Sequence, residues 1–117
     1  MSMDAAFARV CTVAASTRLP GIEKGVSYGT PSLKVKGKFL ARMKDDETLV
    51  IRCPLEEKEF LMGADPAIFF ETDHYKGYDA VLVRLGTADD GAIAGRIEVA
   101  WRMQAPKRLQ AQHRTAP

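Results

Sequence analysis

The residues whose chemistry is most conspicuous lie together in the segment from Asp73 to Tyr78. His74 could act as a general base oriented by Asp73 or another acid, with Tyr28 or Tyr78 as a hydrogen-bond donor. Adjacent residues seldom orient one another in that manner, and no nucleophile elbow, phosphate loop or metal-spaced histidine pair accompanies them. We therefore predict that the protein is not an enzyme and holds no metal or cofactor.

The same segment has two interpretations that involve no catalysis. In the first, the edges of the aromatic rings and nearby polar groups form a site for a small anion, a peptide or another protein partner. The residues of this predicted site are Tyr28, Thr30, His74, Tyr75, Lys76 and Tyr78. In the second, the rings cover a sheet, His74 satisfies a backbone or carboxylate group, and Gly77 permits a tight turn. Convergence of these side chains on a concave pocket would favour the first interpretation, and tight interdigitation of the rings the second.

Positive charge gathers in a predicted hairpin, because residues 25–43 contain no acidic residue. Cations two residues apart in a strand share a side and could contact successive phosphates of duplex DNA. We expect Lys34 and Lys36 to share one side of the first strand. Lys38 and Arg42 are expected to share a side of the second. With a basic segment near the C-terminus, the predicted nucleic-acid-binding residues are Lys34, Lys36, Lys38, Arg42, Lys107 and Arg108. Alternatively, these lysines only solvate the outer face of a half-buried sheet.

Composition is that of a globular protein, with 117 residues, 46% hydrophobic and 27% charged. This length is typical of one domain, so we expect a single domain over residues 1–117. The net charge is only +2, but residues 1–44 carry eight basic and two acidic side chains, whereas residues 45–73 carry two basic and nine acidic. The charge is therefore bipolar along the chain, which can mark an electrostatic partner.

Neither a membrane span nor an export signal is apparent, since the apolar stretches are short and no basic segment precedes an apolar one at the N-terminus. We expect a cytoplasmic protein with no membrane partner. Cys11 and Cys53 lack the paired spacing of a zinc or redox motif, and are expected to be buried thiols.

Hydrophobic periodicity predicts an α+β fold. The spacing of Phe7, Val10 and Ala14 favours a helix over residues 4–18. Alternation then predicts an antiparallel meander, in which Phe39 and Met43 are among the residues expected to face the core. Further elements are predicted at residues 54–62 (helix), 80–85 (strand), 89–103 (helix) and 107–114 (helical turn). The expected architecture is an N-terminal helix, an antiparallel sheet of about five strands, and C-terminal helices packed on one face.

Five short motifs occur in order along the chain: Ser27-Tyr28-Gly29-Thr30-Pro31, Asp65-Pro66, His74-Tyr75-Lys76-Gly77-Tyr78, Val81-Leu82-Val83-Arg84-Leu85, and Ala100-Trp101 with Ala105-Pro106-Lys107. Together they resemble the MmcQ/YjbR family over nearly the whole chain. The resemblance implies an α+β fold similar to the C-terminal domain of the phage transcription factor MotA, with a "double wing" sheet. It also implies a DNA-binding role, through fold-level analogy, and brings no catalytic residue set.

Overall fold

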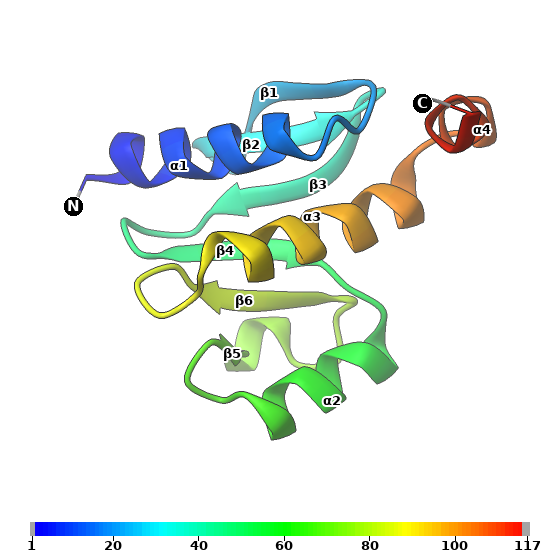
Figure 1. Ribbon diagram of the computed structural model, residues 1–117. Coiled ribbons are helices and arrows are strands. Elements are labelled where there is room, and N and C mark those ends of the chain that lie inside the picture. Colours follow the sequence, from blue (N-terminus) through cyan, green and yellow to red (C-terminus); the bar gives the residue numbers. More distant parts are fainter. Residues whose placement is uncertain (1, 116–117) are drawn as a thin grey trace.

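The computed structural model describes residues 2–115 (Figure 1). Its elements follow in the order α1 (Met3–Ser16), β1 (Ile22–Ser27), β2 (Thr30–Val35), β3 (Lys38–Met43), β4 (Thr48–Arg52), α2 (Leu55–Ala64), β5 (Phe69–Phe70), the 3₁₀ turn η1 (Asp73–Tyr75), β6 (Ala80–Arg84), α3 (Asp90–Gln104) and α4 (Lys107–Thr115). None of these described helices is long and apolar enough to cross a membrane.

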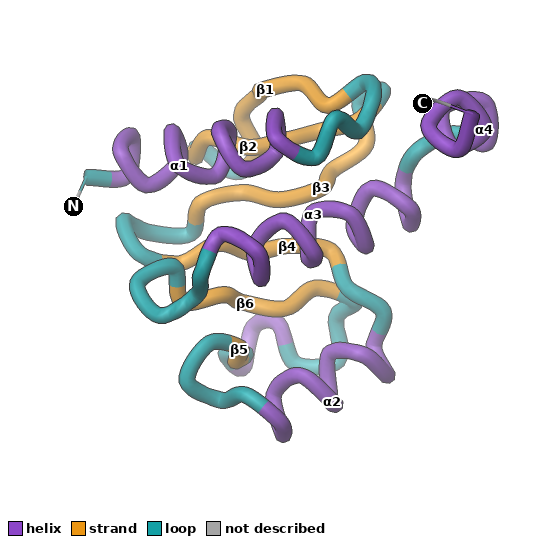
Figure 2. The backbone as a smooth tube through the Cα atoms, viewed as in Figure 1, coloured by secondary structure: helices purple, strands orange, loops and turns teal. Residues whose placement is uncertain are grey.

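The strands form one antiparallel sheet in the order β1-β2-β3-β4-β6-β5, which confirms the predicted α+β class. Its six strands exceed the expected number of about five. The segment Ile22–Ser27, in which no strand was predicted, pairs along β2, and Phe69–Phe70 pairs with β6 at the other edge. Figure 2 shows the strands side by side with the helices in front of them and below the sheet.

Two helices, α1 and α3, cover one face of the sheet and enclose the main core (Figure 1). Their apolar faces meet alternate residues of the central strands, and the most deeply buried members include Val10, Leu49, Ile51, Val81, Ile93, Ile97 and Trp101. The indole of Trp101 donates a hydrogen bond to the carbonyl of Pro20, at 2.9 Å, so its one polar group is satisfied. The helix predictions were accurate to within about two residues.

A β-bulge interrupts the pairing of β2 with β3. Leu33 lies opposite Ala41 and Lys34 lies opposite Phe39, which leaves Leu40 as an extra residue on β3. Leu40 and Ala41 both enter the core. Because opposed residues share a face, Phe39 lies on the face of Lys34 rather than on the core side. The expectation that Phe39 faces the core was wrong, since alternation cannot be carried through a bulge.

The same bulge separates two cations that were expected to share a side. Lys38 lies opposite Val35 and Arg42 lies opposite Ser32. Val35 and Ser32 are three residues apart in one strand and therefore point to opposite faces. Lys38 consequently lies on the helix-covered face and Arg42 on the other, so their predicted alignment was wrong.

The second face of the sheet carries a smaller cluster of buried residues over its β4, β6 and β5 side. There Val50, Ala80 and Leu82 are buried beneath Tyr75, which the turn η1 supplies, and Phe70 packs beside them. This small second core places the aromatic motif directly on the sheet.

Candidate functional site

The turn between β2 and β3 consists of Lys36 and Gly37, both with positive φ, 49° and 79°. Positive φ at both central residues is the signature of a type I′ hairpin turn, which favours asparagine followed by glycine. A lysine in this left-handed region costs about 1 kcal/mol. Residues held at such a cost concentrate at functional sites, so Lys36 is a candidate for function.

The basic residues around this turn form no ion pair with any residue that the structure describes. Ion pairs among the described residues instead involve Arg9, Arg52, Lys58, Arg96 and Arg102. Lys34 faces Glu23 across the β1–β2 pairing, yet the two side chains do not form an ion pair. Lys34, Lys36 and Lys38 therefore form no ion pair with any described residue at this end of the sheet.

The helix α4 packs at the same end of the sheet as the β2–β3 turn (Figure 1). Leu109 belongs to the main core, and its Cδ1 atom would lie only 2.8 Å from a Cβ placed on Gly21. The side chain of Gln104 donates a hydrogen bond to the carbonyl of Phe39, at 3.0 Å. Lys107 and Arg108 are exposed on α4, so the structure brings them to the same end as the hairpin lysines.

The aromatic motif on the second face is held from within by Lys58 of α2. Its ammonium donates hydrogen bonds to the carbonyls of Tyr75 and Tyr78, at 2.8 and 3.0 Å, and pairs with Glu71 at 2.9 Å. The Lys58 side chain is only 1% exposed. Nothing in the sequence marks this residue as buried, because a lysine among the glutamates of α2 has the pattern of a solvated helix face.

The rings of the motif pack against one another. Ring centroids are 4.9 Å apart for His74 and Tyr75, 5.9 Å for His74 and Tyr78, and 6.0 Å for Tyr75 and Tyr78. A cavity of about 650 Å³ opens elsewhere on the molecule, and none of the six predicted ligand-binding residues lines it. Tyr75 is buried, whereas His74 and Tyr78 are exposed around it, so only the Tyr75 ring has the packing expected of an architectural role. The ligand or partner site stays a prediction.

Arg42 joins the two predicted sites. Its guanidinium donates hydrogen bonds to the hydroxyl of Tyr75, at 2.6 Å, and to Thr30, at 3.4 Å. It also lies 5.3 Å from the ring centroid of Tyr28, whose side chain is 89% exposed. Lys76 is exposed beside this cluster. Arg42 thus belongs structurally to the aromatic motif, although the sequence pattern grouped it with the basic hairpin.

The two thiols are poorly placed for chemistry. Burial raises the pKa of Cys53, against the opposing charge of Arg96, whose guanidinium lies 3.5 Å from the sulfur. Burial likewise raises the pKa of Cys11, against the charge of Lys24. Among residues 2–115, no group of three or more histidine, cysteine or acidic side chains is arranged to hold a metal ion.

Comparisons with known proteins agree with the resemblance found in the sequence. Two curated relatives, "Uncharacterized protein Rv2570" of Mycobacterium tuberculosis and "Uncharacterized protein Mb2600" of Mycobacterium bovis, are each 43% identical over 60 residues. The alignment covers 50% of this chain and 46% of each relative, so the chain spans about half the length of the curated relatives it matches. No solved structure matches. The YjbR family model matches residues 17–103, well over half of the chain, and the protein therefore belongs to the YjbR family.

Proposed function

We propose that this protein is a non-enzymatic module that binds the phosphate backbone of duplex DNA through the tip of its β2–β3 hairpin. The observation that supports this most is the distribution of Lys34, Lys36 and Lys38 around a two-residue turn, without an acidic partner among the described residues. Cations gathered at one turn without ion-pair partners favour attraction to a polyanion.

The register of the two-residue turn gives this proposal a specific geometry. Lys34 and Lys38 lie on opposite faces of the hairpin, and Lys36 lies at its tip. β1 pairs with β2 as far as Val35, so only Lys36 and Gly37 extend beyond the paired strands. A turn flanked by cations on both faces of the sheet can meet the phosphates on both walls of the major groove of B-form DNA, which is about 12 Å wide. The hairpin would therefore enter the groove tip first, rather than lie with one face flat against the backbone.

The remaining predicted cations take different parts in this proposal. Lys107 and Arg108 belong to α4, which lies at the same end of the sheet, and would reach phosphates flanking the groove (Figure 1). Arg42 already donates to Tyr75 and Thr30, and we leave it outside the phosphate-contacting set. Lysine contacts to phosphates fix position without reading base sequence, so we expect weak sequence preference.

The test is a fluorescence anisotropy titration of a short labelled DNA duplex at low salt. The variant K36E/K38E is compared with K44E/K76E, which changes the net charge equally but at lysines outside the β2–β3 turn. We expect the hairpin variant to lose binding and the control variant to keep most of it. Absence of low-salt binding by the natural protein, or equal losses in the two variants, would sink the proposal.

A further inference from the structure

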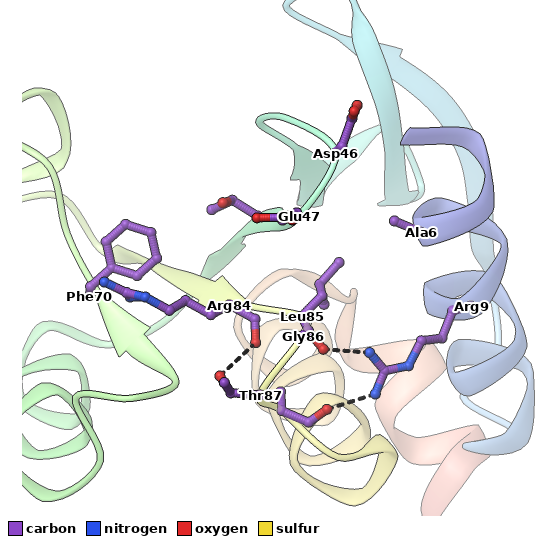
Figure 3. Close-up of a pocket in the computed structure, with 11 residues that line it drawn as sticks. Ala6, Arg9, Asp46, Glu47, Phe70, Arg84, Leu85, Gly86 and Thr87 are labelled. Carbon is purple, nitrogen blue, oxygen red and sulfur yellow. Dashed lines mark hydrogen bonds between the residues drawn. The ribbon is translucent and has the colours of Figure 1, made fainter. Parts of the chain in front are cut away.

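A cavity of about 650 Å³ is lined by residues of segments that lie at the opposite end of the sheet from the β2–β3 turn (Figure 1 and Figure 3). It opens between the first half of α1, the turn that joins β3 to β4, and the segment that follows β6. Its walls are formed by Ala6, Arg9, Asp46, Glu47, Thr48, Phe70, Arg84, Leu85, Gly86, Thr87 and Ala88. Pockets that hold small molecules have volumes of about 300 to 1,000 Å³, so this cavity is of a suitable size.

Some of its polar groups are already committed to the fold. Arg9 donates to the carbonyls of Leu85 and Ala88, at 2.6 and 2.7 Å, and pairs with Asp90 at 2.9 Å. The hydroxyl of Thr87 donates to the carbonyl of Ala67, at 2.7 Å. These groups form a fixed wall, and their donors are not available to a ligand.

Three charged side chains of the lining remain uncommitted. Asp46, Glu47 and Arg84 form no side-chain hydrogen bond or ion pair with any described residue. The guanidinium carbon of Arg84 lies 3.8 Å from the ring centroid of Phe70, a cation–π contact that holds the charge in place (Figure 3). The cavity thus presents the guanidinium of Arg84, held in place by Phe70, and two carboxylates. The positive and negative groups are not paired with each other.

We propose that this cavity binds a small zwitterion that carries an ammonium and a carboxylate group. The carboxylate would pair with Arg84, whose planar guanidinium suits bidentate recognition, and the ammonium with Glu47 and Asp46. An apolar body joining the two charges would contact the apolar part of the lining, to which Leu85 belongs. A ligand with only one charge leaves part of this site unpaired, which lowers its affinity.

The test uses β-alanine, γ-aminobutyrate and ε-aminocaproate, whose charges are separated by increasing lengths of chain, in NMR titrations of amide shifts. Butyrate and butylamine serve as single-charge controls. We expect saturable shifts at residues 46–48 and 84–88, with at least one zwitterion binding about tenfold more tightly than either control. The absence of saturable shifts with all three zwitterions, or equal affinity for a zwitterion and a control, would overturn the proposal.

Two variants assign the charges. R84Q is expected to bind the zwitterion no more tightly than a control, and still to show amide shifts with butylamine. E47Q is likewise expected to lose the preference for the zwitterion, and still to show amide shifts with butyrate. K76Q, which changes an exposed cation outside the cavity, is expected to bind like the natural protein. If R84Q and E47Q keep the full preference for the zwitterion, the assignment of Arg84 and Glu47 is wrong and the proposal fails.

Discussion

The ammonium of Lys58 lies 2.9 Å from a carboxylate oxygen of Glu71, and the same group donates to the carbonyls of Tyr75 and Tyr78. A charged group from α2 is thereby buried under the turn that carries the aromatic motif. Burial of a charge is tolerated only when the charge is paired and hydrogen-bonded, as this one is. The shape of the motif therefore depends on a residue outside it.

Replacement of Lys58 by methionine should destabilise the protein by about 3 kcal/mol. The substitution keeps the bulk of the side chain but leaves Glu71 and two carbonyls without their donor. Urea denaturation measures the change, and K76M, at an exposed lysine of the same motif, should stay within about 0.5 kcal/mol of the natural protein. Similar stabilities for K58M and K76M would show that the buried ammonium does not hold the motif.

Substitutions in the two turns with positive φ should change the stability of the protein and its binding to duplex DNA independently. K36N should stabilise the protein by up to about 1 kcal/mol, because asparagine tolerates the left-handed backbone better than lysine does. It should also weaken duplex binding, because a proposed phosphate contact is lost. Tyr28 has a φ of 53° in the other two-residue turn, but its ring also contacts the guanidinium of Arg42, so Y28N should stabilise the protein less than K36N does and leave duplex binding unchanged. Thermal unfolding and anisotropy titrations measure the two effects, and unchanged duplex binding by K36N would contradict the assignment.

The ionisation of Asp45, in the turn before β4, should make the stability of the protein depend on pH. Burial opposes ionisation of Asp45, but hydrogen bonds from the amide of Glu47 and from Thr48, with the charge of Lys44, hold its pKa below the ordinary value of 3.8. A lowered pKa in the folded state stabilises the fold above the ordinary value, and this contribution is lost as the pH falls through the folded-state pKa. NMR titration of the Asp45 carboxyl should give a pKa below 3.8. In D45N, the free energy of unfolding should fall less steeply as the pH is lowered through this range. A pKa at or above 3.8 would contradict this account.

Both thiols should react slowly in the folded protein, because burial raises the pKa of each and the thiolate is the reactive form. Cys53 is fully buried and Cys11 only partly, so iodoacetamide should modify Cys11 first. Mass spectrometry follows the reaction, with the urea-unfolded protein as the control in which both thiols react. Rapid modification of Cys53 without denaturant would mean that β4 and α2 open readily.

The helices and central strands could be predicted from the sequence because their apolar residues recur at the periods of buried helices and strands. The strand β1 could not, since Gly25 and the charged Glu23 and Lys24 break its alternation. Its pairing depends on the neighbouring strand β2 rather than on a pattern of its own. The bulge at Leu40 is likewise invisible to alternation, and it decides on which faces Lys38 and Arg42 lie.

The candidate sites were predictable only in part. Sequence order grouped Arg42 with the lysines of its hairpin, but its hydrogen bond to Tyr75, 33 residues later in the chain, depends on the folded sheet. The pairing of Lys58 with Glu71 and the cavity beside Arg84 also join segments distant in sequence. Such arrangements leave no local pattern, so only the folded structure identifies them.

The central claim is that Lys36 at the hairpin tip contacts a DNA phosphate. The most direct measurement is the slope of the logarithm of duplex affinity against the logarithm of salt concentration, for the natural protein, K36Q and K76Q. Each phosphate contact contributes about 0.9 to this slope. The account predicts that K36Q lowers the slope by about that amount and that K76Q leaves it unchanged. An unchanged slope for K36Q, or no salt-dependent binding by the natural protein, would contradict it.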